Sequence, residues 1–322
     1  MKVTVIIITW NKKNLLKNCL SSLERQTYKN FQTIVIDNGS SDRTIEFIKE
    51  FYPKIKTINL EKNLGFSIAA NEGIKASESK YVILLNNDTV VDKNFVKNLF
   101  ESLDNHREYC ACTAKIIDYF NKNILASAGD IMNNVGQSFS RGFGDRIDKF
   151  DKPEEVFLIT GGASIFRKNV FKKIGFFDED YFMYGEDSDW CFRAQLFGYK
   201  FCYEPKAIVY HYCKATSKSM IKIIDYFHFR NMTLTILKNF PLGIFFKRLR
   251  FITIPLVHLN TFFYMTIKGH LKEAIKADFW IMKHLHRIVR KRLAIQSKRK
   301  VSIDYINNWL KPKQIRFFQF VK

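Results

Sequence analysis

Short runs of branched apolar residues alternate with amphipathic stretches along the first 120 residues. The apolar runs at 3–9, 32–37, 54–59 and 81–85 predict buried parallel strands. The stretches at 13–24, 44–50, 66–77 and 94–103 carry apolar residues at helical spacing and predict helices. This alternation predicts an α/β fold, with an open sheet between helices.

Polar residues and glycines follow every one of these predicted strands. The strand ends read Trp10-Asn11, Asp37-Asn38-Gly39, Asn63-Leu64-Gly65 and Asn86-Asn87-Asp88. Because open α/β sheets bind ligands outside the carboxyl ends of their strands, these residues are candidates for a binding site. Asp88 among amides could hold a hard divalent cation through oxygen. Alternatively, it caps a turn or the following helix.

A second acidic group lies between about residues 110 and 211, where the strand and helix patterns are mixed. Glu186, Asp187 and Asp189 lie among aromatic residues, just before an apolar helix expected at 190–197. Acids in a first helical turn are favoured by the helix dipole, which is the simpler explanation. A carboxylate beside a hydrophobic cleft can also serve as a general base toward a hydroxyl. His211 ends a late strand, where a lone histidine is more often structural than a ligand.

These motifs, taken in order, resemble those of family 2 glycosyltransferases. The resemblance covers about residues 3–230 and rests on VTVIIITWN at 3–11, DNGSSDRT at 37–44, NLGFSIAANEG at 63–73, LLNNDT at 84–89, Gly161–Ala163, FFDEDYFMYGEDSDWCFR at 176–193, and the strand at 203–211. The similarity is greatest to the rhamnosyltransferase-like branch of bacterial surface-polysaccharide enzymes. It implies a GT-A fold with a mixed, mostly parallel sheet in a catalytic domain at 1–230. The nucleotide-sugar half would be 1–120 and the acceptor half 121–230.

The resemblance also assigns roles to individual residues. It implies a donor site made by Thr9, Trp10, Asn11, Asp37, Asn38, Asn63, Gly65, Asn71 and Asn87. Asp88 and His211 would contact a divalent metal, Mg²⁺ or Mn²⁺, or the diphosphate. Asp187 would be the catalytic base for an inverting single displacement, and Gly162, Glu186 and Trp190 would bind the acceptor. The metal motif begins with Asn86 where an aspartate is common, so only Asp88 carries charge there.

The expected substrates follow from the same resemblance. The donor would be a dTDP-, UDP- or GDP-linked sugar, and the rhamnosyltransferase-like branch implies rhamnose as that sugar. The acceptor would be a glycan or a lipid-linked saccharide. A dinucleotide-binding dehydrogenase is disfavoured because no GxGxxG motif follows the first strand.

Positive charge is concentrated at the end of the chain. The net charge is +21, and residues 238–322 hold 19 Lys and Arg against three acids. We expect 231–322 to be a helical basic region that binds an anionic membrane surface rather than nucleic acid. The apolar stretch 251–267 is too short to span a bilayer and is flanked by basic clusters at 247–250, 287–292 and 298–300.

Other interpretations of the basic region remain open. It could pack on the catalytic domain as a solvated cap, form a homodimer contact, or belong to a nucleic-acid-binding α/β protein. Six scattered cysteines and the lack of a signal peptide predict reduced thiols and a cytoplasmic location, peripheral on the inner face of the membrane.

Overall fold

The computed structural model describes residues 1–213 and 220–310, which fold into two compact units. Unit 1 consists of Met1–Asp130, Ser140–Phe182 and Tyr199–Ala215. Unit 2 consists of Ile131–Phe139, Met183–Gly198 and Thr216–Lys322. This division differs from the predicted boundary at residue 230, since unit 2 takes in the acidic segment 183–198. Residues 311–322 of the predicted basic region lie outside the described residues.

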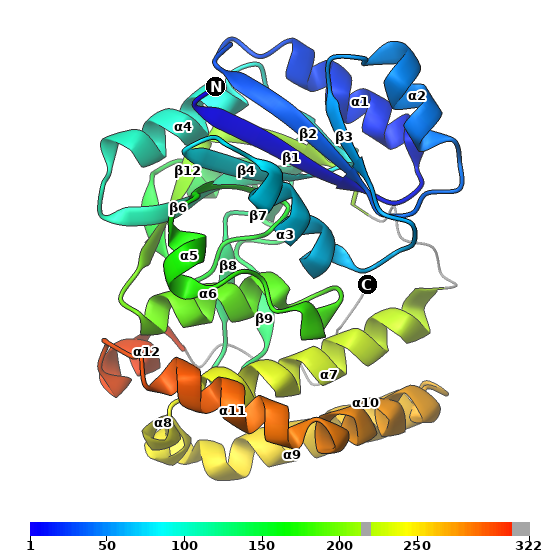
Figure 1. The fold of residues 1–322 in the computed structure, drawn as a ribbon. Helices are drawn as coiled ribbons and strands as arrows, with labels where there is room; N and C mark the ends of the chain where they lie inside the picture. The colour runs from blue at the N-terminus through cyan, green and yellow to red at the C-terminus, as the bar shows by residue number, and fades with distance from the viewer. Residues whose placement is uncertain (214–219, 311–322) are drawn as a thin grey trace. The chain divides into compact units, whose positions relative to one another are not determined.

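Most of the strands belong to one sheet in unit 1, and the pair β8–β9 is separate (Figure 1). The strands are β1 (Val3–Thr9), β2 (Phe31–Asp37), β3 (Lys56–Asn59), β4 (Tyr81–Asn86), β5 (Thr89–Val91), β6 (Tyr109–Asp118), β7 (Leu125–Ser127), β8 (Asp130–Met132), β9 (Ser138–Ser140), β10 (Glu154–Val156), β11 (Ala163–Arg167) and β12 (Lys200–His211). The main sheet has the order β10-β12-β6-β11-β4-β1-β2-β3, with β5 beside β12 and β7 beside β6.

The helices divide between the two units. Unit 1 holds α1 (Lys13–Glu24), α2 (Thr44–Phe51), α3 (Phe66–Ala76), α4 (Phe95–Asn105), α5 (Val170–Ile174) and the 3₁₀ helices η1 (Ile147–Phe150) and η2 (Glu179–Tyr181). Unit 2 holds α6 (Glu186–Leu196), α7 (Ile221–Asn239), α8 (Leu242–Phe246), η4 (Lys247–Leu249), α9 (Arg250–Ile267), α10 (Leu271–Lys283), α11 (Leu285–Gln296) and α12 (Ile303–Trp309).

The sheet is mixed and mostly parallel, as predicted. β1 pairs in parallel with β2 and with β4, and β2 pairs in parallel with β3. β11 runs antiparallel between β4 and β6, and β6 pairs in parallel with β12. The register sets Thr9 opposite Asp37 and Ile8 opposite Asn86, so the carboxyl ends of three strands meet at one edge.

Helices cover both faces of this sheet because β1 is apolar on both sides. Val5 and Ile7 belong to a core that includes Leu20 of α1 and Leu99 of α4. On the other face α3 comes so close that a Cβ on Gly73 would lie 2.4 Å from the Ile6 Cγ2 atom. Figure 1 shows α3 on the side of the sheet away from α1. The glycine at this position is therefore a packing requirement of the α3–β1 contact.

In unit 2, α7 is the helix against which α6, α9, α10 and α11 pack. A small apolar core is formed by Phe229 of α7, Met265 of α9, and Ala274 and Ala277 of α10. The alanines let α10 approach α7 closely. Within the described residues, no helix is both long enough and apolar enough to cross a bilayer.

Helix α6 begins at Glu186, four residues before the predicted start at 190, so all three acids fall in its first turn. The residue before it, Gly185, has a left-handed φ of 86°, which ends the preceding loop. Carboxylates in a first turn complement the helix dipole, which explains the earlier start.

A buried charged network joins α6 to α7. Asp189 is fully buried, and its Oδ1 accepts hydrogen bonds from Lys238 Nζ at 2.7 Å and Asn239 Nδ2 at 2.8 Å. Its Oδ2 accepts from Arg193 Nε at 2.9 Å. Both oxygens are thus satisfied, and the acid offsets the charge of a lysine that is only 1% exposed.

We expect Asp189→Ala to destabilise the protein by about 3–5 kcal/mol, because it leaves Lys238 buried without its counter-charge. Asp187→Ala is the matched control from the same helical turn, and being partly exposed it should cost about 1 kcal/mol or less. The urea midpoint of unfolding of each variant measures the difference. Equal midpoints would contradict the structural role of Asp189.

Candidate functional site

The candidate site in unit 1 is built where β1, β2 and β4 end. The Thr9 carbonyl accepts a hydrogen bond from the Asn38 amide at 2.8 Å. The Thr9 hydroxyl accepts from Asn87 Nδ2 at 2.9 Å. Thr9, Asn38 and Asn87, all predicted donor residues, are therefore brought together by the sheet.

Asp37 is the buried carboxylate of this edge. Its Oδ2 accepts from the Ser40 amide at 3.1 Å, whereas its Oδ1 is buried and has no hydrogen-bond partner. Gly39 follows with a φ of 79°, and a Cβ there would lie 2.6 Å from the main chain of Lys62. The turn after β2 is therefore pressed against the segment that follows β3.

Two asparagines lock these two loops together. Asn38 Nδ2 donates to Asn63 Oδ1 at 3.0 Å and to the Gly65 carbonyl at 3.3 Å. Asn38 Oδ1 accepts from the Leu64 amide at 2.9 Å, and Asn63 Oδ1 also accepts from the Gly65 amide at 2.9 Å. These hydrogen bonds hold the loop after β2 against the loop after β3.

Asn71 has its hydrogen bonds elsewhere in unit 1. Its Nδ2 donates to the Phe177 carbonyl at 2.9 Å, and its Oδ1 accepts from the Phe177 amide at 3.0 Å. Because Asn71 is 1% exposed and both of its polar atoms are engaged, the structure gives it a supporting position behind the loops.

The residues after β1 form the more open part of the edge. The Asn11 amide donates to the Ser40 hydroxyl at 2.7 Å, and its Oδ1 accepts from the Ser41 amide at 2.8 Å. Asn11 and Lys12 both have a φ of 59°, a strained conformation for residues other than glycine. Trp10 beside them is 42% exposed, which leaves its ring accessible.

Asp88 and His211 form an ion pair, with His211 Nε2 3.2 Å from Asp88 Oδ1. Apart from this ion pair, Asp88 Oδ1 is buried and has no hydrogen-bond partner. Burial raises the pKa of Asp88, but His211 outweighs that effect, so this pKa lies below its usual value. Burial lowers the pKa of His211, while Asp88 and Cys213 raise it to a net value of about 10.

This pair fits a divalent cation of the kind that the sequence analysis expects. A carboxylate oxygen without a hydrogen-bond partner and an adjacent imidazole are both metal ligands, and a cation would displace the imidazole proton. Residues 1–213 and 220–310 contain no cluster of three or more His, Cys, Asp or Glu that could hold a metal. Two protein ligands are typical of Mg²⁺ sites that complete their coordination with substrate phosphates and water.

Gly162 lies against the same edge. Its carbonyl accepts from the Asn86 amide at 2.9 Å, and a Cβ on it would lie 2.6 Å from Asn86 Nδ2. Any larger residue at position 162 would therefore displace the Asn86 side chain.

The acidic group lies in unit 2, on the first turn of α6. Asp189 is engaged in the buried network with Lys238. Glu186 is buried, and its Oε2 has no hydrogen-bond partner. Burial, and then the charge of Asp187, raise the pKa of Glu186 well above its usual value. Of the three acids only Asp187 is partly exposed, with Oδ1 accepting from the Ser188 amide at 2.7 Å. Trp190 is fully buried, which favours a packing role over direct contact with an acceptor.

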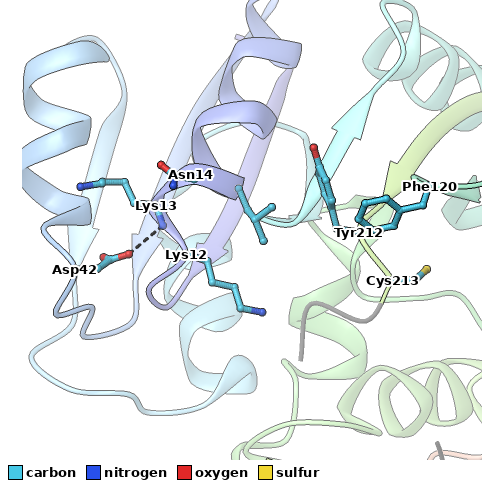
Figure 2. Close-up of a pocket in the computed structure, with 8 residues that line it drawn as sticks. Lys12, Lys13, Asn14, Asp42, Phe120, Tyr212 and Cys213 are labelled. Carbon is cyan, nitrogen blue, oxygen red and sulfur yellow. Dashed lines mark hydrogen bonds between the residues drawn. The ribbon is translucent and has the colours of Figure 1, made fainter. Parts of the chain in front are cut away.

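A cleft of about 690 Å³ opens beside the edge in unit 1 (Figure 2). Its lining includes Lys12 and Lys13 at the start of α1, and Phe120 and Tyr212 opposite them. The Tyr212 amide donates to the Asp88 carbonyl at 3.0 Å, and the charge of Lys12 contributes to the low pKa of Asp88. Sequence reasoning missed these residues, although Lys12 and Tyr212 directly follow the predicted residues Asn11 and His211.

One property distinguishes three of the four predicted site carboxylates from the other acids. Among the described residues, the buried carboxylate oxygens that lack a hydrogen-bond partner belong to Asp37, Asp88 and Glu186. Leaving a buried polar atom without a partner costs about 1–3 kcal/mol, more when it is charged. Such atoms are explained when a ligand supplies the missing partner.

In sequence, the chain is similar to known glycosyltransferases. The profile described as Glycosyl transferase family 2 matches residues 4–175. Poly-beta-1,6-N-acetyl-D-glucosamine synthase of Staphylococcus epidermidis is 28% identical over 208 residues, 64% of this chain and 48% of that protein. Glycosyltransferase GlyA of Streptococcus pneumoniae serotype 4 is 27% identical over 236 residues, 70% of this chain and 33% of that protein. The chain thus spans half or less of the length of these relatives, which do not single out the rhamnosyltransferase-like branch.

Solved structures share the fold at low sequence identity. GalNAc-T7 with UDP, GalNAc and Mn²⁺ superposes with a TM-score of 0.60 at 16% identity, over 74% of this chain and 48% of that one. A mannosyltransferase from Pyrobaculum calidifontis with GDP-Man and Mn²⁺ gives 0.53 at 15% identity, over 92% of this chain and 84% of that one. The fold is therefore GT-A, as predicted.

We expect Gly39→Ala to destabilise the protein more than Gly144→Ala does. Both glycines have φ near 80°, so both substitutions carry the same backbone strain of about 1–3 kcal/mol. Only at Gly39 would the added Cβ collide with main-chain atoms, whereas nothing lies within 4 Å at Gly144. Urea midpoints that coincide for the two variants would show that the loops are not held in contact.

Proposed function

Because this chain belongs to glycosyl transferase family 2, we propose that it transfers a hexosyl group from a nucleotide-diphosphate sugar to a hydroxyl of a glycan or lipid-linked acceptor. The observation that carries this proposal is the pair of buried carboxylate oxygens at Asp37 and Asp88, which have no hydrogen-bond partner. Asp37 ends β2 and Asp88 follows the end of β4, on the edge of the sheet where an α/β fold binds its ligand.

Asp37 and its neighbours would hold the nucleoside. Asp37 Oδ1 would accept a hydrogen bond from a ribose hydroxyl or a base N–H, which removes the cost of leaving that oxygen without a partner. The exposed ring of Trp10 would stack on the base. The bond between Asn38 and Asn63 holds the two loops in place before the ligand arrives, so little ordering is needed on binding.

Asp88 and His211 would hold a divalent cation, Mg²⁺ or Mn²⁺, together with the donor diphosphate. When bound, this cation would neutralise the negative charge that develops on the departing diphosphate. Lys12, whose charge acts on Asp88, would add a positive charge at the same place.

Asp187 would act as the general base on the acceptor. Its carboxylate takes the proton of the acceptor hydroxyl while that oxygen forms a bond to the anomeric carbon. The bond from this carbon to the diphosphate breaks in the same displacement, and the nucleoside diphosphate leaves with the electron pair. Burial excludes Asp189 from this role. The raised pKa of Glu186 favours its neutral acid form, which cannot take the proton of the acceptor hydroxyl.

Acceptor binding is assigned to Gly162 and Glu186 as part of this proposal. A neutral Glu186 can donate a hydrogen bond to a sugar hydroxyl through its partnerless Oε2. Trp190 would support the helix that carries Glu186 and Asp187. Rhamnose and N-acetylhexosamines are the transferred sugars to be compared first, linked to dTDP, UDP or GDP.

A nucleotide panel tests the donor site directly. We expect UDP, dTDP or GDP to raise the melting temperature of the protein, more strongly with Mn²⁺ or Mg²⁺ present, because a ligand stabilises the folded state that binds it. No shift with any nucleoside diphosphate, with or without metal, would overturn the donor assignment.

Asp88→Asn should remove the metal-dependent part of that shift, because it takes away the charged ligand while keeping the shape of the side chain. Asp104→Asn is the matched control, because Asp104 accepts a hydrogen bond from Tyr81 at the opposite, amino end of β4, and it should behave like the wild type. A metal-dependent shift that persists in Asp88→Asn would remove Asp88 from the site.

Asp187→Asn should lower the rate of sugar transfer by about 10²–10⁴-fold, the range supplied by a general base. Nucleotide binding should remain close to that of the wild type in the thermal-shift assay. Transfer at a near wild-type rate would show that another group is the base.

A further inference from the structure

Helix α9 exposes a stripe that is entirely apolar. Ile252, Leu256, Leu259, Phe263 and Ile267 recur at intervals of three and four residues and so share one face. Their exposed fractions run from 46% to 82%, so no described residue covers them. The opposite face, with Val257, Thr261 and Met265, is the buried one.

A second exposed stripe runs along α10 and continues into α11. Its members also recur at intervals of three and four, and they are Leu271, Ile275, Phe279, Met282, Leu285, Val289 and Leu293. The buried side of α10 is formed by Ala274, Ala277 and Ile281. The sequence analysis did not foresee this stripe, because basic residues interrupt it in the linear sequence.

Both stripes point away from α7. The buried sides of α9 and α10 meet Phe229 of α7 through Met265, Ala274 and Ala277, so their exposed sides face outward. Figure 1 shows α9, α10 and α11 on the same side of α7. We call the twelve exposed apolar residues of the two stripes the α9–α11 face. Twelve exposed apolar residues on helices that contact one another indicate a binding surface.

Exposed cations border the α9–α11 face. Lys272, Lys276 and Lys283 form an exposed row along α10, and Lys268 follows α9. Within 242–296 eleven Lys and Arg stand against two acids, Glu273 and Asp278, and neither acid is fully exposed. His258 Nε2 lies 3.1 Å from Asp278 Oδ1, which offsets the charge of that acid.

Two arginines of the predicted basic clusters do not contribute to the charge around the α9–α11 face. Arg292 donates to the carbonyls of Leu237 at 2.7 Å and Phe240 at 2.6 Å, which caps the end of α7. Arg250 is fully buried and donates to the Asn134 carbonyl at 2.7 Å. These two arginines hold unit 2 together, so the row of lysines carries the outward charge.

We propose that the α9–α11 face lies flat on an anionic phospholipid bilayer, with its apolar residues among the acyl chains and its lysines at the headgroups. Apolar residues flanked by lysines, on helices that do not span a bilayer, are typical of in-plane membrane binding. Charge complementarity selects the anionic lipid. This inference deepens the proposed function, because membrane binding would bring the enzyme to a lipid-linked acceptor. In that respect it rests on the proposed function.

A second copy of the chain fits this surface less well. The buried centre of a protein–protein interface is depleted in lysine, whereas here an exposed row of lysines runs along α10 beside its apolar stripe. Two copies meeting face to face would also bring their lysine rows together, and like charges repel.

Vesicle sedimentation with the full chain tests the proposal. Wild-type protein should bind vesicles of phosphatidylglycerol and phosphatidylcholine, bind pure phosphatidylcholine far more weakly, and lose affinity as salt increases. Lys272→Gln/Lys276→Gln/Lys283→Gln should bind the anionic vesicles about a hundredfold more weakly. Its matched control, Lys49→Gln/Lys54→Gln/Lys97→Gln, changes three exposed lysines of unit 1 and should bind like the wild type.

The apolar contribution is tested separately. Leu259→Ser/Phe263→Ser should bind anionic vesicles at least tenfold more weakly, because two side chains leave the acyl region. Both residues are at least half exposed, so the fold should be unaffected, and Phe51→Ser on α2 is the control. Circular dichroism verifies that each variant is folded.

Other outcomes would overturn the proposal. These are absence of vesicle binding, equal binding to neutral and anionic vesicles, or binding to duplex DNA in place of vesicles. A dimer in solution that Leu259→Ser/Phe263→Ser converts to a monomer would assign the face to a second copy. Nucleotide-dependent thermal shifts, recorded without lipid, separate the two hypotheses. Shifts without vesicle binding would refute only the membrane face, and vesicle binding without shifts would refute only the donor site.

Discussion

The parallel pairing of β1 with both β2 and β4 determines where every residue of the candidate donor site lies. Its register sets Thr9 opposite Asp37 and Ile8 opposite Asn86, so the polar residues that follow these strands emerge together. A slip of one residue would turn the apolar side chains of β1 to the wrong face and separate the polar strand ends. The core packing of Val5 and Ile7 on one face and Ile6 on the other therefore also fixes the site.

The aspartates of this protein show how surroundings decide whether an acid is structural or available for chemistry. Asp189 is fully buried, and both of its oxygens accept hydrogen bonds from Arg193, Lys238 and Asn239. Asp37 is buried almost as completely and Asp88 is partly exposed, yet each keeps one buried oxygen without a hydrogen-bond partner, which in Asp88 is the oxygen paired with His211. A satisfied carboxylate contributes to stability, whereas an unsatisfied one reduces it until a ligand binds. This difference distinguishes the two aspartates of the candidate donor site from Asp189 in the interior of unit 2.

Much of the fold could be predicted because its signals are local. Strand β1 and helix α1 have the predicted bounds, since branched apolar runs and helical spacing are visible in the sequence. The partners of Asn71 could not be predicted, because it bonds to Phe177, 106 positions away. The three acids of α6 are equivalent in sequence, and only burial distinguishes Asp187 from Glu186 and Asp189. Likewise, the basic run 290–292 did not reveal that Arg292 points inward.

The distribution of cysteines gives the protein a natural position for a chemical label. All six cysteines fall within the described residues and are free, and five are buried, Cys213 alone being partly exposed. Burial raises the pKa of Cys19 to about 12 and that of Cys110 above its usual range, which makes these thiols unreactive. Cys213 lines the cleft beside Lys12 and Tyr212. A thiol-reactive fluorophore would therefore attach next to the donor edge without mutagenesis, and its emission would report directly on occupancy of the cleft.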